Sequence, residues 1–177
     1  QLLAMEGADV NDTNRNGKAA SHFTAQLRCD TDVLALLVAA KADVNAAAHR
    51  GHAPLIYASG RCRGDVVSFL LEHGAPVNST ANPKGMTPLH LAVIGGHEDV
   101  CARLLVAGAD PSIKDKYRRT PLAYAAKFGH DTLRWRLQNN TKDQGSVRRE
   151  GLATEAVHRS PQTCPSPGEA VGESLSA

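Results

Sequence analysis

Short motifs recur along this chain every 33 to 34 residues, and this repetition constrains the fold more than any other feature. A glycine recurs every 34 residues, at Gly17, Gly51 and Gly85. Arg118 takes its place in the last unit. A second motif keeps the same period, with Gly-Ala-Asp-Val-Asn at 7–11 and variants at 41–45, 74–78 and 108–112. These matching periods indicate a repeat protein, in which each unit packs only on its neighbours.

The residues of the clearest unit predict a pair of short helices. Thr87 is a favourable N-cap, and Pro88 suits the first helical position, where a missing N–H costs nothing. Asp99 is expected to open a second helix, since its charge is favourable at the positive end of the helix dipole. Leu104 and Leu105 fall on one face of this helix, and we expect both to be fully buried between layers.

The motifs resemble ankyrin repeats, whose signature joins Gly-x-Thr-Pro-Leu-His-x-Ala to Leu-Leu-x-x-Gly-Ala-Asp-Val-Asn. The resemblance implies an all-α solenoid of helix-turn-helix units with β-hairpin loops. It covers residues 1–140, with a partial repeat at 1–11 and repeats at 12–45, 46–78, 79–112 and 113–140. Residues 141–177 are rich in Gly, Ser, Thr, Pro and Glu, and this composition predicts a disordered C-terminal tail.

The two ends of the repeat array differ. In the last unit Arg134 replaces Cys101 and Gln138 replaces Leu105, so the face that would meet a further repeat has become polar, as a terminal cap requires. The other end shows no such cap, and the chain begins at Gln1. We therefore expect upstream repeats to be missing. An alternative hypothesis follows, in which the chain is a targeting or regulatory segment of a larger multidomain protein.

The overall composition argues against several classes of protein. Aromatic residues make up only 4%, which favours stacked helices over a β-sandwich, and the net charge of +2 gives no general attraction to nucleic acid or membrane. No stretch approaches the ~18 apolar residues of a membrane helix. The cysteines show no C-x-x-C spacing, so we expect reduced thiols and a cytoplasmic or nuclear protein; they are Cys29, Cys62, Cys101 and Cys164.

Catalysis is not expected, because the chain has no phosphate-binding loop, no Gly-x-Ser-x-Gly and no His-Glu-x-x-His. The resemblance implies that His22 and His90 are structural and that His97 and His130 tie adjacent turns together. Histidines spaced by a whole repeat belong to different layers, which argues against a metal site. We therefore expect no cofactor and no enzymatic activity.

The resemblance implies a protein-interaction module, an adaptor or scaffold, with no obligate oligomer. Such a module binds through a concave groove lined by the hairpin tips and the first helices. The corresponding positions here are Arg15, Asn16, Lys18, Gln26, Leu27, His49, Arg50, His52, Gly60, Arg61, Pro83, Lys84, Met86, Ile94, Gly95, Lys116, Tyr117, Arg119, Lys127 and Phe128. Eight of them are lysine or arginine and none is acidic.

Acidic residues instead belong to the second helices and the turns before them: Asp32, Asp65, Glu72, Glu98, Asp99 and Asp131. This sorting predicts a partner with an acidic segment, for which Met86, Ile94, Tyr117 and Phe128 offer apolar anchor contacts. Two alternatives stay open. In the first, the basic residues serve only to keep an exposed groove soluble. In the second, the module binds nucleic acid.

Two kinds of modification are also suggested. Some ankyrin proteins are substrates of an asparaginyl hydroxylase that accepts Leu-x5-Asp-Val-Asn, and this pattern ends here at Asn11 and Asn45. In the tail, Ser160 and Ser166 each precede a proline and form minimal proline-directed phosphorylation sites.

Overall fold

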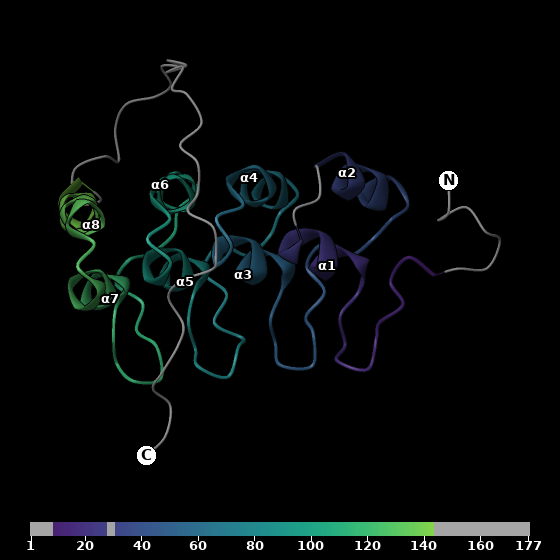
Figure 1. The fold of residues 1–177 in the computed structure, drawn as a ribbon, viewed down its shortest axis with the longest axis horizontal. Coiled ribbons are helices and arrows are strands. Elements are labelled where there is room, and N and C mark those ends of the chain that lie inside the picture. Colours follow the sequence, from purple (N-terminus) through teal and green to yellow (C-terminus); the bar gives the residue numbers. More distant parts are fainter. Residues whose placement is uncertain (1–8, 28–30, 144–177) are drawn as a thin grey trace.

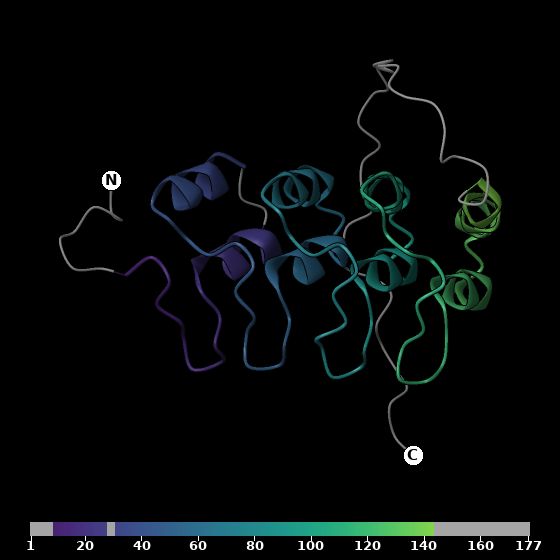
Figure 2. The same ribbon diagram turned by 180° about the vertical axis from the view of Figure 1, so that it is seen from behind.

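The computed structural model describes residues 9–27 and 31–143, in which eight helices form four pairs. Figures 1 and 2 show two rows, with α1, α3, α5 and α7 in one and α2, α4, α6 and α8 in the other. We call these the inner and outer rows. The helices are α1 Ala20–Gln26, α2 Thr31–Ala39, α3 Pro54–Ser59, α4 Gly64–Glu72, α5 Pro88–Ile94, α6 Glu98–Val106, α7 Pro121–Phe128 and α8 Asp131–Asp143.

Long connections project from the side of the inner row, away from the outer row (Figure 1). We call them fingers, and they comprise residues 9–19, 40–53, 73–87 and 107–120. Over the described ranges they are turns and bends without a strand, and backbone bonds cross single fingers as in hairpins: the Asn14 N–H donates to the Lys18 carbonyl at 3.0 Å, and the Ala48 N–H donates to the His52 carbonyl at 3.2 Å. Neighbouring fingers are joined by backbone bonds: the His49 N–H donates to the Asn16 carbonyl at 3.1 Å, and the Lys116 N–H donates to the Lys84 carbonyl at 3.0 Å. No helix of the described part is long and apolar enough to cross a bilayer.

The expected start of the inner helices is confirmed. In α5 the Thr87 hydroxyl accepts a hydrogen bond from the His90 N–H at 3.3 Å, and Pro88 occupies the first helical position. The outer helix α6 begins at Glu98, one residue before the expected Asp99. Both carboxylates lie in its first turn, where the helix dipole favours negative charge.

Leucine and valine side chains fill the space between successive layers. Each inner helix contacts the inner helix of the next unit, and each outer helix contacts its outer neighbour. The most deeply buried aliphatic side chains recur in every layer: Leu34, Leu37, Leu55, Val66, Val67, Leu70, Leu89, Val100, Leu104, Leu133 and Leu137. Leu104 is fully buried as expected, whereas Leu105 is only half-buried. The expectation for Leu105 is therefore wrong, because it lies at the edge of the face that Leu104 presents to the core.

Two buried histidines join consecutive units. Nδ1 of His90 accepts the Thr87 N–H at 3.1 Å, and Nε2 lies 3.1 Å from the Arg119 carbonyl in the next unit. His22 repeats this arrangement with the Ala19 N–H and the His52 carbonyl, both at 3.1 Å. An Nδ1 atom that accepts a hydrogen bond carries no proton, so the proton of each ring is on Nε2, which donates to the carbonyl. Both imidazole rings are therefore neutral. Burial lowers the pKa of both histidines below the usual 6.5.

The finger glycine is required where the next finger packs closely, as at Gly17 and Gly51; at Gly85 a Cβ would make ordinary contact, 3.4 Å from Lys116. Gly51 has φ +68°, and a Cβ there would lie 2.0 Å from the Ala81 carbonyl oxygen of the next finger. Arg118 occupies the same place in the last unit with φ 60°. Because no further finger packs against it within the described residues, a side chain fits there despite the left-handed backbone. The exception in the repeat pattern is thus explained by its position at the end of the array.

The last helix has the polar outer face that was expected of a cap. Arg134 and Gln138 are exposed, while Leu133 and Leu137 point into the core and are 1% exposed. Trp135, the single tryptophan of the chain, is 67% exposed on this helix. α8 has 13 residues where α6 has nine, so it extends past the end of the preceding outer helix.

Removing the Leu104 side chain is expected to destabilise the protein by about 2–5 kcal/mol, because Leu104→Ala leaves a cavity between two layers. Val106→Ala on the same helix is the matched control: its side chain is 91% exposed, and a change within about 0.5 kcal/mol is expected. Urea denaturation of both variants measures the difference. A cost below about 0.5 kcal/mol for Leu104→Ala would show that the stacking register is wrong.

Gly51→Ala is expected to be more destabilising than Gly74→Ala. Both glycines have positive φ, so each alanine incurs about 1–2 kcal/mol of backbone strain. Only Gly51 faces a neighbouring finger, because nothing lies within 4 Å of a Cβ built at Gly74. Thermal or urea unfolding of the two variants tests this order, and equal costs would argue against close finger packing.

The free energy of unfolding is expected to fall as the pH drops below about 6.5. His22 and His90 resist protonation in the native state, so the unfolded chain binds more protons and acid favours it. Asp65 and Asp115 have pKa values below 3.8 and titrate outside this range. Urea unfolding between about pH 7.5 and 5 gives the slope, and His90→Gln should make it shallower. A free energy of unfolding that does not change with pH over this range would contradict the neutral state of His22 and His90 in the folded protein.

Candidate functional site

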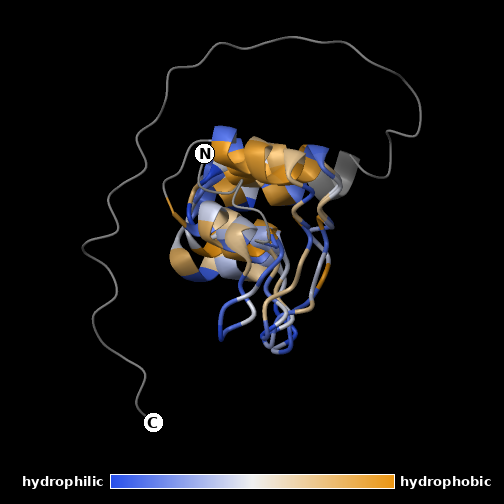
Figure 3. Ribbon diagram, turned by 90° about the vertical axis from the view of Figure 1, so that its right-hand side faces the viewer, coloured by the Kyte–Doolittle hydropathy of each residue, from blue (hydrophilic) through white to orange (hydrophobic). Residues whose placement is uncertain are grey.

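Most side chains expected to meet a partner lie exposed on the fingers and on the ends of the inner helices. We call this surface the finger face. Its exposed members are Arg15, Asn16, Leu27, His49, Arg50, Gly60, Arg61, Pro83, Lys84, Gly95, Lys116, Tyr117, Arg119, Lys127 and Phe128. Lys18, Gln26, His52 and Ile94 are half-buried on it. Figure 3 shows that the finger tips are hydrophilic while the helices above them are largely apolar.

Met86 does not belong to this surface, and its expected role as an anchor is wrong. It is only 7% exposed and packs in the core. The Asn82 side chain accepts the Met86 N–H at 3.0 Å and donates to the Met86 carbonyl, but this bond is not the cause, because Asn14 and Asp115 hold the Lys18 and Arg119 N–H groups in the same way. The difference lies in the side chain: apolar Met86 packs against the core, whereas the charged Lys18 and Arg119 remain at the surface. An apolar residue at this repeat position was the available sequence signal.

The first cluster on the finger face combines a cation with two aromatic rings. The Lys18 ammonium lies 4.4 Å from the centre of the Tyr57 ring and 5.9 Å from that of Phe23. It also donates to Oε1 of Gln26 at 3.0 Å. These contacts bring a finger residue together with α1 and with α3 of the next unit. We call Lys18, Phe23 and Tyr57 the N-terminal cluster; each of its cation–ring contacts is worth about 0.5–1 kcal/mol at an exposed site.

A second cluster lies in the last unit. The Arg119 guanidinium carbon is 5.1 Å from the centre of the Tyr117 ring and 5.7 Å from that of Tyr124. Tyr124 is held in place because its hydroxyl donates to Oδ2 of Asp115 at 2.6 Å. Backbone N–H groups of Tyr117 and Arg119 donate to Oδ1 of Asp115 at 2.9 and 2.8 Å. We call Tyr117, Arg119 and Tyr124 the C-terminal cluster.

The electrostatics of Asp115 fit this fixed arrangement. Burial raises its pKa, but hydrogen bonds from Tyr124, Arg119 and Tyr117 outweigh burial and hold it below its usual value. Burial and the adjacent carboxylate raise the pKa of Tyr124. Asp115 therefore stays ionised and Tyr124 stays protonated at neutral pH, which keeps the ring beneath Arg119 in one orientation.

Between the two clusters the inner helix α5 presents apolar side chains, while the basic residues of the middle units, Arg50, Arg61 and Lys84, lie on the finger tips and just after α3. Leu91 and Ile94 of α5 take the places that aromatic or cationic side chains hold at Tyr57, Tyr124 and Lys127. Gly60 lies beside them, and a Cβ built there would be in ordinary contact, 3.8 Å from Cβ of Leu91. Gly60 has φ −79°, so its lack of a side chain is not a backbone requirement; it leaves Leu91 uncovered.

The acidic residues of the outer row are exposed, as the sorting of charge predicts: Asp32, Asp65, Glu72, Glu98, Asp99 and Asp131. The fingers, however, also carry aspartates that the sequence argument passed over. Asp9, Asp43 and Asp110 each accept the N–H of the residue two positions on, at 2.8 Å. Their carboxylates are thus used within the fingers, in the Asx turns that aspartate commonly forms.

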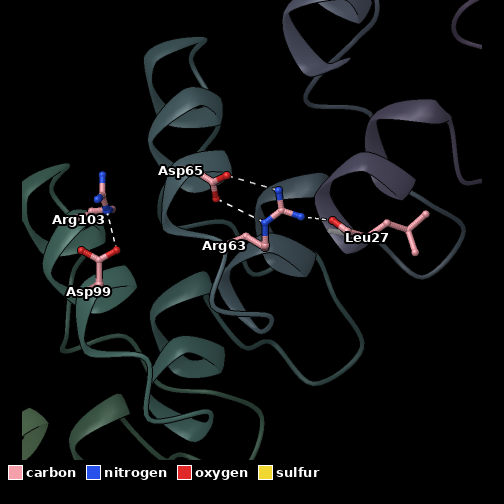
Figure 4. Close-up of polar contacts among 5 residues, drawn as sticks. All are labelled: Leu27, Arg63, Asp65, Asp99 and Arg103. Atoms are coloured by element: carbon pink, nitrogen blue, oxygen red, sulfur yellow. Dashed lines mark hydrogen bonds and ion pairs between the residues drawn. The ribbon is translucent and has the colours of Figure 1, made fainter. Parts of the chain in front are cut away.

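Polar contacts also tie layers together on the side of the outer helices. Figure 4 shows Arg63 between the Leu27 carbonyl oxygen and the Asp65 carboxylate, whose Oδ1 is 3.4 Å from Nε. Farther along, Arg103 contacts Asp99 at 2.9 Å within α6 (Figure 4) and donates to Ser68 of α4 at 2.7 Å. These arginines join neighbouring units, unlike those of the finger face.

The asparagines expected as hydroxylation sites bridge consecutive fingers. Asn11 donates to the Lys41 carbonyl at 3.3 Å and accepts the Asp43 N–H at 2.7 Å. Asn45 donates to the Gly74 carbonyl at 3.4 Å, but the matching acceptor bond is missing because Pro76 has no N–H. Asn45 is therefore held by one bond fewer than Asn11. Ser160 and Ser166 lie outside the described residues.

Three further features bear on the chemistry. Cys101 is a buried free thiol whose pKa is raised to about 12 by burial, so it is unreactive. Cys62 is disulfide-bonded, which corrects the expectation that this cysteine is reduced. The described ranges group no three His, Cys, Asp or Glu residues able to hold a metal ion, and His97 instead bonds the Gly60 carbonyl at 3.4 Å, tying two turns as expected.

A hollow of about 450 Å³ lies between α6 and α8, lined by Glu98, Asp131, Thr132, Trp135 and Arg136. It belongs to the outer row, away from the finger face, and sequence reasoning missed it. Trp135 stands where the preceding unit has Ala102, and this substitution was the available signal.

Comparisons with known proteins agree with this geometry. A family model of ankyrin repeats (three copies) matches residues 1–81 and 77–145. Tyrosine-protein kinase Shark of Drosophila melanogaster is 31% identical over 160 residues, covering 85% of this chain and 17% of that protein. ARF GTPase-activating protein GIT1 of Homo sapiens is 44% identical over 68 residues, 38% and 9% of the two chains.

Nuclear factor NF-kappa-B p105 subunit of Rattus norvegicus is 50% identical over 73 residues, covering 41% of this chain and 8% of that protein. The chain spans less than a fifth of the length of each of these relatives. Their names differ in function, so the likeness lies in the repeat segment and not in one activity. With its family match over most of its length, its paired helices and its projecting fingers, the chain belongs to the ankyrin-repeat family.

Proposed function

We propose that this chain is a non-catalytic protein-interaction module, an adaptor or scaffold, that holds an acidic segment of a partner protein on its finger face. Ankyrin repeats generally serve as protein-interaction modules, and the family is typically non-catalytic. The observation that carries the proposal is the unpaired positive charge of this face. The ion pairs found among the described residues, Arg63–Asp65 and Arg103–Asp99, both involve the outer row or the turn before it.

Binding to such a face draws on two kinds of contact. Lys18 and Arg119 are already positioned over aromatic rings, so less side-chain freedom is lost when a carboxylate arrives. Tyr117 and Phe128 are 59% and 47% exposed and offer large apolar surfaces beside these cations. The charge steers the encounter, and the aromatic contacts add residence time.

The wider context of the module belongs to the proposal. Because the relatives extend far beyond the matched segment, the chain acts as a targeting or regulatory part of a larger protein, in the cytoplasm or nucleus. Asn45, with one bond fewer than Asn11, is the preferred asparagine for hydroxylation, and phosphate at Ser160 or Ser166 would regulate the tail. Peptide mass spectrometry of the protein from cells detects either modification as added oxygen or phosphate.

Reversing the charge of Arg50, Lys84 and Arg119 together is expected to abolish selection of acidic peptides. A library of random displayed peptides, panned against the natural sequence, should enrich Asp and Glu beside apolar residues. The triple variant to glutamate should lose this enrichment. For the recovered peptides, association should slow and its salt dependence should flatten, because the variant no longer attracts negative charge over a distance.

The matched control reverses Lys41, Arg134 and Arg136, which are exposed and carry the same total charge; Lys41 lies at the base of its finger, two residues after the end of α2, and both arginines lie on α8. It should leave the selection unchanged. Selection of peptides without an acidic bias would contradict the proposal. Acidic peptides that both triple variants bind equally would also contradict it. Preferential capture of single-stranded RNA by the natural sequence, lost only in the finger-face variant, would favour the nucleic-acid alternative.

A further inference from the structure

Beside the inner helices the order of groups is cation, apolar, cation, while Arg50, Arg61 and Lys84 of the middle units lie on the finger tips and just after α3. At the N-terminal cluster the Lys18 ammonium lies over Tyr57 of α3, and at the C-terminal cluster Arg119 lies over Tyr124 of α7. Between them α5 presents Leu91 and Ile94 without a cation on the helix. The position that holds Lys18 and Arg119 is taken in the two middle units by His52 and by the buried Met86.

His52 adds no positive charge in the middle at neutral pH. Burial, together with the charges of Arg50 and Lys18, lowers its pKa below the usual 6.5. Arg50 and Lys84 are exposed on the finger tips of the middle units and contribute to the general attraction of acidic chains. The cations fixed against aromatic rings beside the inner helices are therefore found at the two ends of the row.

The spacing of these ends follows from helix packing. α3 contacts α5 and α5 contacts α7, so two packing steps separate Tyr57 from Tyr124. Helices pack about 8–10 Å apart, which places the two tyrosine rings roughly 16–20 Å from each other, and the cations lie 4.4 and 5.7 Å from the centres of these rings. An extended chain rises about 3.3 Å per residue, and this distance corresponds to about five or six residues.

Lys18 and Arg119 each retain N–H groups that can donate hydrogen bonds to a ligand. Lys18 uses one donor on Gln26, and the ammonium group has three. The Arg119 guanidinium forms no ion pair with a carboxylate of the described ranges, since Asp115 is occupied by two backbone N–H groups and the Tyr124 hydroxyl. In the middle, the missing side chain at Gly60 leaves space above Leu91 for an apolar side chain of the ligand.

We infer that the occupant of the finger face is an extended segment with two acidic side chains six residues apart and apolar side chains between them. In an extended chain, side chains at i, i+2, i+4 and i+6 point to one side. The two outer ones meet Lys18 and Arg119, and the two inner ones cover Gly60, Leu91 and Ile94. This inference rests on the proposed function, to which it adds the spacing and order of the ligand.

Two fluorescein-labelled peptides of equal composition test the spacing. The first is Glu-Ser-Leu-Ser-Leu-Ser-Glu, and the second has its two glutamates adjacent, as Glu-Glu-Ser-Leu-Ser-Leu-Ser. Fluorescence anisotropy should give a Kd about tenfold lower for the first peptide, or about 1.4 kcal/mol. Lys18→Gln and Arg119→Gln should each remove this preference, because each leaves only one fixed cation.

Variants of Gly60 test the inferred apolar contact in the middle of the ligand. Gly60→Leu should weaken the first peptide severalfold by covering Leu91, while Gly60→Ala should change its affinity little. Both replacements suit the φ of −79°, and circular dichroism with urea unfolding confirms that the fold is intact. If Gly60→Leu binds the first peptide with the same Kd as the natural sequence, the inferred apolar contact over Leu91 is wrong.

The remaining outcomes separate this inference from the proposed function. Equal affinity for both peptides, lost on triple reversal of Arg50, Lys84 and Arg119, overturns the spacing and leaves acidic recognition standing. Binding of both peptides that survives the triple reversal overturns both ideas. Failure of the first peptide to bind overturns the spacing inference, and the library selection then decides the proposed function alone.

Discussion

Packing between layers is the constraint on which the rest of this structure depends. A pair of helices of six to nine residues, such as α3 and α4, is too short to be stable alone and cannot bury its own apolar faces. Leu70 and Leu104 are completely buried only because a neighbouring pair covers each of them. The same requirement explains why the last outer helix exchanges apolar for polar residues at Arg134 and Gln138, where no further described layer follows.

Stacking also places equivalent positions side by side, and this is how the proposed binding surface is assembled. A residue after a finger glycine, such as Lys18, comes to lie against the inner helix of the next unit at Tyr57. The buried histidine ties act at the same junctions, since His22 and His90 each reach the backbone of the following unit. The geometry that stabilises the array thus also fixes the distance between the cations that a ligand meets.

Variation from unit to unit gives the finger face a different set of residues in each layer. The fold requires a histidine tie or a core leucine at given positions, but tolerates different residues on the finger face. Arg118 and Arg119 illustrate this in the last unit: one tolerates a left-handed backbone because no described finger follows, and the other lies over two tyrosines. The family therefore accounts for the architecture, while the residues proposed to bind a partner are those that the repeat leaves free.

The sequence alone determined the repeat period and the helix starts at Thr87 and Pro88, because these depend on local propensity and on spacing. It placed the acidic residues of the outer row correctly, but it passed over the aspartates of the fingers, Asp9, Asp43 and Asp110. It did not determine that Met86 is buried or that Leu105 is only half-buried. Those outcomes depend on which side chains neighbouring layers cover: Met86 packs against the core, whereas Lys18 and Arg119 at the equivalent positions remain at the surface. The N-terminal cluster likewise exists only in the stacked structure, since Lys18 and Tyr57 belong to different units. The C-terminal cluster lies within the last unit, but Tyr117 and Tyr124 come together with Arg119 only in the folded unit.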